Sequence, residues 1–206
     1  MELKLDMLAR ASQALSPAGD RTILLRAIAN LGATKDGYDC IDLTNNEIQK
    51  LDNIPLLPRL RTLIVAGNRI SKIATDLHQS LPNLTSLVLT GNNITHLSDL
   101  EPLFNFKRLE RLSLVDNPVI ALPHFREYVS YRLPSLRYLN FSKVTQKERT
   151  LCDAYFKSNE GKSFLRDQGY DVPSTSGSDK NKEILAMLEK TSDVDKLLQL
   201  EKQLLS

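Results

Sequence analysis

A repeated pattern of apolar residues and asparagine restricts the fold of this chain more than any other feature of its sequence. The asparagines Asn46, Asn68, Asn92 and Asn117 are 22, 24 and 25 residues apart. The four segments that superimpose are Tyr38-x-x-Ile41-x-Leu43-x-x-Asn46-x-Ile48, Leu60-x-x-Leu63-x-Val65-x-x-Asn68-x-Ile70, Leu84-x-x-Leu87-x-Leu89-x-x-Asn92-x-Ile94 and Leu109-x-x-Leu112-x-Leu114-x-x-Asn117-x-Val119. Because a chance match in series is very improbable, each segment is interpreted as one structural repeat.

This template and its period are typical of leucine-rich repeats. Apolar side chains two residues apart lie on one face of a short strand, and successive strands stack these faces into one core. The asparagine amide can bond main-chain groups where the chain leaves the strand, since those groups would otherwise be buried without partners. A tight turn explains Gly67 and Gly91, which directly precede two of the asparagines. The sequence therefore predicts an α/β fold, a leucine-rich-repeat solenoid of about five repeats.

Both ends of the repeat array are predicted to be covered, because a terminal repeat would otherwise expose its apolar layer. Apolar residues from Leu3 to Leu15 recur at helical spacing, which predicts an N-terminal capping helix in residues 1–20. At the other end, the segment Leu136-x-x-Leu139-x-Phe141 is predicted to be a fifth strand that lacks the asparagine and places Phe141 in the core. A helix is expected to follow over residues 145–156.

The composition changes beyond the predicted repeat domain, which spans residues 21–170. Residues 171–182 are polar and contain Pro, Ser and Gly, so they are predicted to be a flexible linker. Residues 183–206 regain apolar periodicity around a break at Thr191–Asp193, which predicts a helical hairpin. An isolated hairpin of this length is marginal, so it is either partly disordered without a partner or a docking element for another protein.

The residues that alternate with the core positions are predicted to line the concave face of the solenoid. Ile64 and Val88 lie in the middle of neighbouring strands, where a face that met only water would carry polar residues. One explanation is the β-propensity of branched residues. The other is an apolar stripe, with Ala66 and Val115, that binds an amphipathic helix of a partner. The candidate partner-binding residues are Asp42, Thr44, Thr62, Ile64, Ala66, Ser86, Val88, Thr90, Arg111, Ser113 and Val115.

The sequence offers little that would support catalysis. The three histidines lie in different repeats, without a carboxylate or cysteine at triad or metal-ligand spacing. The two cysteines, Cys40 and Cys152, are too few and too far apart in sequence for a disulfide framework or a zinc site. We therefore predict no enzymatic activity, no cofactor and no metal. The charged residues near Met1 and the lack of a long apolar run predict a soluble protein without a membrane segment.

Basic residues gather near the end of the repeats, although the net charge of the whole chain is only +2. Residues 132–166 contain eight Lys or Arg and three Asp or Glu. Lys143, Lys147 and Arg149 belong to this cluster and are candidates for contacts to an RNA backbone. A solvated helix surface is the alternative explanation of the same charges.

Two stretches resemble the A-prime family of the spliceosomal U2 snRNP more closely than a generic repeat protein. One is Asn30-Leu31-Gly32-Ala33-Thr34, followed by Asp39-Cys40-Ile41-Asp42-Leu43-Thr44-Asn45-Asn46. The other runs from Asp116-Asn117-Pro118-Val119 through Leu133-Pro134-Ser135-Leu136-Arg137-Tyr138-Leu139-Asn140-Phe141 to Lys147-Glu148-Arg149. The resemblance covers roughly residues 1–165. The first repeat is shorter than that of the family, so whether it forms a full strand stays open.

The resemblance implies a non-enzymatic scaffold that acts in pre-mRNA splicing in the nucleus. Its concave face would hold a helix of the RNA-recognition-motif protein B-double-prime, and the pair would bind a stem-loop of U2 snRNA. By the same resemblance Lys143, Lys147 and Arg149 would lie near this RNA, and the C-terminal hairpin would dock another spliceosomal protein. The alternative function is an intracellular leucine-rich-repeat adaptor for a partner that does not bind RNA.

Overall fold

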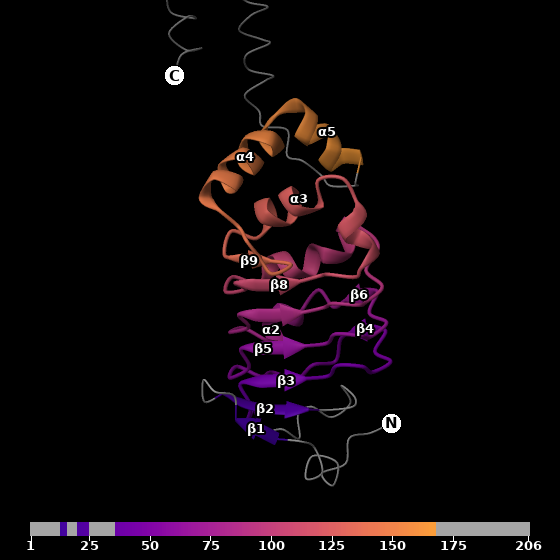
Figure 1. Cartoon of the computed structure of the whole chain (residues 1–206), viewed down its shortest axis with the longest axis vertical. Coiled ribbons are helices and arrows are strands. Elements are labelled where there is room, and N and C mark those ends of the chain that lie inside the picture. The colour runs from indigo at the N-terminus through magenta and orange to yellow at the C-terminus, as the bar shows by residue number, and fades with distance from the viewer. Residues whose placement is uncertain (1–12, 16–19, 25–35, 168–206) are drawn as a thin grey trace, which may run out of the picture. The chain divides into compact units, whose positions relative to one another are not determined.

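The computed structural model describes residues 13–15, 20–24 and 36–167 (Figure 1). Within these residues the main sheet has eight strands in the order β1-β2-β3-β5-β7-β8-β9-β10. Neighbouring strands from β2 to β9 are parallel, whereas the outer pairs β1–β2 and β9–β10 are antiparallel. The strands are β1 (Gln13–Leu15), β2 (Arg21–Leu24), β3 (Cys40–Asp42), β5 (Thr62–Ile64), β7 (Ser86–Val88), β8 (Arg111–Ser113), β9 (Tyr138–Leu139) and β10 (Ser142–Lys143).

The apolar positions of the repeats form a continuous core behind this sheet, as the sequence predicted. The central apolar residue of each inner strand pairs with its equivalent on the next strand, and all of these side chains are at most 2% exposed. They are Ile23, Ile41, Leu63, Leu87, Leu112 and Leu139. Full burial of one such side chain stabilises the fold by about 1.5–3 kcal/mol, so this stack holds together strands of only two to four residues. The predicted leucine-rich-repeat fold is confirmed.

The segments between the strands are short and largely irregular. Strand β4 (Lys50–Leu51) pairs in parallel with β6 (Lys72–Ile73), and helix α2 (Leu77–Ser80) and the 3-10 helix η2 (Leu97–Asn105) follow. An ion pair of 2.7 Å between Lys72 and Asp99 joins β6 to η2. Burial acts to raise the pKa of Asp99, but hydrogen bonds from the Lys72 ammonium and the His96 main-chain N–H outweigh it and hold that pKa below its ordinary value.

The repeat asparagines bond main-chain groups where the chain leaves each strand, as predicted, and Asn68, Asn92 and Asn117 also join neighbouring repeats. Asn92 is 3% exposed, and its Nδ2 donates to three main-chain oxygens over 2.9–3.3 Å. Its Oδ1 accepts the main-chain N–H of Ile70 at 2.9 Å. The three oxygens belong to Val65, Leu89 and Thr90. Asn68 and Asn117 make the same four contacts in their own repeats. Each amide therefore satisfies buried groups from two repeats at once.

The residue before each asparagine turns the chain in a left-handed conformation. Its φ is 57° at Asn45, 62° at Gly67, 66° at Gly91 and 56° at Asp116. Glycine, asparagine and aspartate tolerate this region best, which confirms the turn as the reason for Gly67 and Gly91. At Gly67 a side chain would also collide with its neighbour, because a Cβ there would lie 2.3 Å from Oδ1 of Asn45.

The predicted N-terminal capping helix is wrong for residues 13–15. These residues form β1, which pairs antiparallel with β2, while residues 1–12 and 16–19 lie outside the described part of the chain. Pairing along the sheet edge here overrides the helical spacing of the leucines. The first repeat does form a strand, β2, which pairs with β3 and buries Ile23 completely. The shortened first repeat is therefore a full member of the sheet.

The fifth repeat strand ends earlier than predicted. The chain reverses through Asn140 and Phe141, so that Ser142 of β10 pairs with Leu139 of β9. Both turn residues have positive φ, 50° and 64°, as in a two-residue type I′ turn. Phe141, which we expected in the core, is 76% exposed because this turn carries its side chain out of the apolar layer. The left-handed conformation costs a residue with a Cβ about 1–2 kcal/mol.

Helices cover the C-terminal end of the array (Figure 1). The 3-10 helix η3 (Pro118–Ala121) and α3 (Phe125–Arg132) precede β9, and α4 (Gln146–Lys157) and α5 (Asn159–Asp167) follow β10. The helix predicted after the repeats is confirmed as α4, which begins with a capping box between Thr145 and Glu148. Tyr128 and Phe156 are buried between these helices and contact edge to face. The predicted linker and C-terminal hairpin, residues 171–206, lie outside the described residues.

Candidate functional site

The predicted binding residues lie in three rows on the concave face, which we define as the side of the sheet that carries these rows. Residues opposite one another on neighbouring strands form the first two rows, and hydrogen bonds just beyond the strands align the third. The first row is Thr62, Ser86 and Arg111, and it continues to Tyr138. The second is Asp42, Ile64, Val88 and Ser113. The third is Thr44, Ala66, Thr90 and Val115.

The apolar stripe of the concave face is shorter than the sequence suggested. Ile64 and Val88 are direct neighbours on adjacent strands, as predicted, and both are partly buried. The next residue in their row, Ser113, is 4% exposed, and its hydroxyl is 2.8 Å from the hydroxyl of Thr90. This polar pair separates Val115 from the stripe. The stripe therefore consists of Ile64 and Val88, with Ala66 beside them.

The acidic end of the face is occupied by a local hydrogen-bonded pair. The Asp42 carboxylate accepts both the main-chain N–H and the hydroxyl of Thr44. An aspartate and a threonine two residues apart are suited to this arrangement, which orders both side chains. At each end of the stripe the polar residues thus form a hydrogen-bonded pair, Asp42 with Thr44 at one end and Ser113 with Thr90 at the other. The apolar side chains of Ile64 and Val88 are the part of this row that a partner can contact.

A hollow lies beside the stripe, between strands β7, β8 and β9. Its volume is about 230 Å³, and its floor is formed by the sheet at Leu87 and Leu112. The surrounding residues are Ser86, Val88, Arg111, Ser113, Tyr138 and Phe141. The Arg111 guanidinium lies over the Tyr138 ring, 5.7 Å from its centroid. The concave face therefore contains a small cavity with aromatic and cationic walls in addition to the stripe.

Two residues of this hollow, Tyr138 and Phe141, are not among the predicted binding residues. Tyr138 alternates with the core positions, so the sequence places it on the concave face, where it continues the first row. Phe141 occupies the third apolar position of the repeat template, which predicts a place in the core. The signal that could have identified it is Asn140, since asparagine is favoured at the first position of a type I′ turn and so indicates that the chain reverses there.

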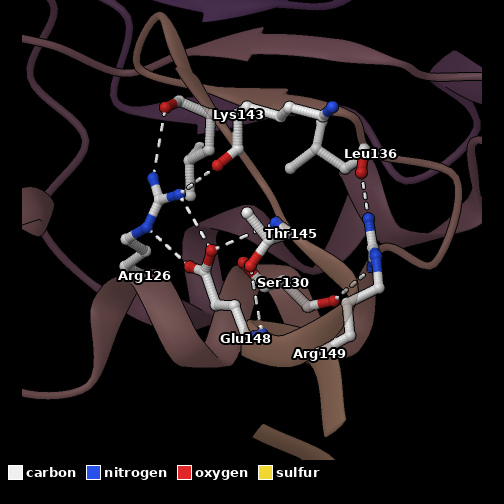
Figure 2. A network of polar contacts seen from close by, with 8 residues as sticks. Arg126, Ser130, Leu136, Lys143, Thr145, Glu148 and Arg149 are labelled. Atoms are coloured by element: carbon white, nitrogen blue, oxygen red, sulfur yellow. Dashed lines mark hydrogen bonds and ion pairs between the residues drawn. The ribbon is translucent and has the colours of Figure 1, made fainter. Parts of the chain in front are cut away.

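Arg149, one of the candidate RNA contacts, has its guanidinium engaged within the cap (Figure 2). It donates to the main-chain oxygens of Ser130 at 3.1 Å, Leu133 at 3.3 Å and Leu136. The first two lie at the C-terminal end of α3, where helix carbonyls lack intrahelical partners and attract a cation. Arg149 thus joins α4 to the end of α3.

A second arginine supports the same corner of the cap. Arg126 donates to the Glu148 carboxylate at 2.6 and 3.2 Å, and also to the main-chain oxygens of Leu139 and Lys143 (Figure 2). Glu148 in turn accepts the main-chain N–H of Thr145 and so completes the start of α4. These contacts fix the β9–β10 hairpin, and with it Phe141, against helices α3 and α4.

The remaining RNA candidates, Lys143 and Lys147, have exposed side chains on the cap. Lys143 ends β10, and Lys147 lies in the first turn of α4. Lys147 contributes to a second, shallow hollow of about 460 Å³ that is also lined by Glu127 and Glu148. Of the three predicted RNA candidates, Lys143 and Lys147 thus have exposed side chains, whereas Arg149 is hydrogen-bonded within the cap.

The described part of the chain shows no feature that would indicate catalysis or metal binding. None of its His, Cys, Asp and Glu side chains form a group of three suited to hold a metal ion. Burial raises the pKa of the thiols of Cys40 and Cys152, so both are protonated at neutral pH and poor nucleophiles. None of the described helices is long and apolar enough to cross a membrane.

The chain is similar to known proteins over most of its length. It matches the protein family described as Leucine-rich repeat over residues 1–168. The probable U2 small nuclear ribonucleoprotein A′ of Drosophila melanogaster is 43% identical over 172 residues, which are 81% of this chain and 65% of that protein. The human U2 small nuclear ribonucleoprotein A′ is 44% identical over 172 residues, which are 81% of this chain and 68% of that protein.

A solved structure agrees with these sequence relationships. A chain in the crystal structure of the Drosophila melanogaster SNF/U2A′ complex is 44% identical and superimposes with a TM-score of 0.78, over 81% of this chain and 99% of that one. The chain spans about two thirds of the length of the curated relatives, 65% of the fly protein and 68% of the human one. By these matches, the chain belongs to the U2 small nuclear ribonucleoprotein A′ family of leucine-rich-repeat proteins.

Proposed function

We propose that the chain is a non-enzymatic scaffold of the U2 snRNP that acts in pre-mRNA splicing in the nucleus. Its concave face binds a helix of an RNA-recognition-motif protein of the B-double-prime type, and the pair binds a stem-loop of U2 snRNA. The observation that carries this proposal is the pair of apolar side chains, Ile64 and Val88, in the centre of a largely polar face. The similarity to a chain solved as part of the SNF/U2A′ complex supports a protein partner.

The dimensions of the face favour a helix as the bound element. Residues along a strand are about 3.3 Å apart, so the first and third rows are separated by about 13 Å. A helix with its side chains is about 10–12 Å across and fits between these rows over the stripe. An amphipathic helix would bury its apolar side on Ile64 and Val88 and place polar side chains against Thr62 and Thr90.

The cap is the proposed site of RNA contact next to the bound partner. Lys143 and Lys147 are exposed and have ammonium groups that can approach phosphates without giving up a structural contact. Such contacts contribute affinity that does not depend on the RNA sequence and that weakens with salt. The C-terminal hairpin expected in residues 183–206 is proposed to dock another spliceosomal protein.

A charge placed in the stripe tests the proposed partner site. Val88→Glu and Ile64→Glu should each weaken binding of the homologous B-double-prime-type protein at least tenfold, because a carboxylate would be buried there without a partner. Binding is measured by titration calorimetry with the full chain and the intact partner. Circular dichroism should show an unchanged fold, since both side chains are only partly buried in the free protein.

Leu56→Glu is the matched control for this experiment. Leu56 is 65% exposed and lies between β4 and β5, away from the three rows, so its change should leave affinity within about twofold. If both stripe variants bind as tightly as the unmodified chain, the concave stripe is not the partner site. If the unmodified chain binds no such protein, the adaptor function for a different partner replaces the proposed one.

A further inference from the structure

Two of the residues that line the hollow of the concave face are exposed aromatic side chains. Phe141 is 76% exposed and Tyr138 is 39% exposed, and both border the cavity between β7, β8 and β9. Contiguous exposed apolar side chains around a concavity are typical of binding sites. The cavity volume of about 230 Å³ exceeds the roughly 150 Å³ that holds a benzene molecule in an engineered protein cavity.

The backbone at Phe141 indicates that its exposure is maintained for a purpose other than stability. Asn140 and Phe141 are the two central residues of the β9–β10 turn, with φ of 50° and 64°. In a type I′ turn glycine is preferred at the second of these positions, because it has no Cβ to be strained. The chain places a large aromatic residue there and holds the hairpin through the Arg126 contacts. Strain that persists in this way is typical of binding and catalytic sites.

Arg111 places a positive charge at the edge of the hollow. Its side chain stacks on Tyr138, and in the part of the chain that the structure describes it forms no ion pair with a carboxylate. An arginine held by an aromatic ring and otherwise open presents its donors to an incoming acidic group. The hollow thus combines an apolar interior with one unpaired cation on its rim.

We propose that this hollow is the anchoring pocket for one large apolar side chain of the partner helix, with Phe141 and Tyr138 as its walls. An acidic residue three or four positions along the same helix then pairs with Arg111, because residues at that spacing lie on one helix face. The pocket rests on the proposed function, since its occupant is the helix bound on the stripe. It extends that site from Val88, which borders both features, toward the cap.

Two variants of Phe141 test the pocket separately from the fold. Phe141→Ala and Phe141→Gly should each weaken binding of the B-double-prime-type protein about tenfold or more, since buried aromatic anchors dominate interface energies. Phe141→Gly should leave the thermal midpoint of unfolding unchanged or raise it, because glycine relieves the left-handed turn. A purely structural role predicts the opposite, a lower midpoint and unchanged affinity. Phe141→Tyr should retain the affinity.

The proposed ion pair between Arg111 and the partner helix is tested by a separate variant. Arg111→Gln should weaken binding of the same partner several-fold and flatten the dependence of affinity on salt, because one charge pair across the interface is lost. Leu56→Ala, at an exposed leucine outside the concave face, should change neither quantity.

Failure of the pocket can be distinguished from failure of the proposed function. If Val88→Glu abolishes binding while both Phe141 variants bind within twofold of the unmodified chain, the helix lies on the stripe and the pocket assignment is wrong. If the unmodified chain does not bind the partner, both are wrong. Loss of affinity in the Phe141 variants, with an unchanged or higher midpoint for Phe141→Gly, supports the pocket.

Discussion

Replacing Asn92 with alanine is expected to lower the free energy of unfolding by about 2–4 kcal/mol. The Asn92 amide satisfies three main-chain oxygens and the N–H of Ile70, all near the edge of the core. Alanine leaves the buried N–H of Ile70 without its partner, which costs about 1–3 kcal/mol before local relaxation. It also removes one hydrogen bond from each of the three oxygens, which keep their bonds to Asn68, Asn117 and the N–H of Gly67. The loss is measured by urea unfolding followed by circular dichroism.

The neighbouring asparagine provides a matched control. Asn93 is exposed and only its main-chain N–H takes part in the ladder, bonding the oxygen of Ile70. Asn93→Ala should therefore change the free energy of unfolding by less than about 0.5 kcal/mol. Equal effects of the two substitutions would contradict the structural role assigned to the repeat asparagines.

Replacing Arg149 with alanine is expected to destabilise the cap by about 2–3 kcal/mol. The guanidinium donates to the main-chain oxygens of Ser130 and Leu136 (Figure 2) and to that of Leu133, which also accepts the main-chain N–H of Leu136. Arg149→Lys should recover only part of the loss, because a compact ammonium cannot reproduce the planar fork of donors. The measurement is the shift of the urea midpoint for each variant.

Lys147, two residues earlier on α4, separates the structural role of Arg149 from RNA binding. Lys147→Ala should leave stability within about 0.5 kcal/mol. It should also reduce the slope of log affinity against log salt by about 1 when the complex with the partner binds the U2 stem-loop. Arg149→Gln, which removes the charge, should leave that slope unchanged. If Arg149→Gln is as stable as the unmodified chain but reduces the slope, Arg149 contacts RNA and its assignment to the cap is wrong.

The repetition of the pattern explains why most of the fold could be predicted from the sequence. A residue such as Leu87 pairs with its own equivalents on both sides, so one template assigns core, strand and turn to every inner repeat. The ends have no such neighbour on one side, and both end predictions were partly wrong. Residues 13–15 gain sheet hydrogen bonds that helical spacing does not encode, and Phe141 is displaced by a turn that follows directly after β9.

The candidate site could likewise be predicted only where it follows from the repeat pattern. Alternation along the strands identified Ile64 and Val88, because a side chain on one face of a parallel sheet is fixed by its register. The hydroxyl contact between Thr90 and Ser113 and the carbonyl contacts of Arg149 depend on side-chain distances that no linear pattern contains. A basic residue near the end of a repeat array is equally compatible with an RNA contact and with a helix cap until its partners are known.

Photo-crosslinking from the two outer rows tests most directly whether a helix lies on the concave face. A benzophenone side chain is placed at Thr62 or Ala66, which flank Ile64 on β5 and its extension, and at Leu56 as a control. In the complex, both flanking positions should crosslink to residues three and four apart on a single helix of the RNA-recognition-motif protein, and Leu56 should not crosslink. Crosslinks from Leu56 alone, or from Thr62 and Ala66 to the partner's sheet, would contradict the account.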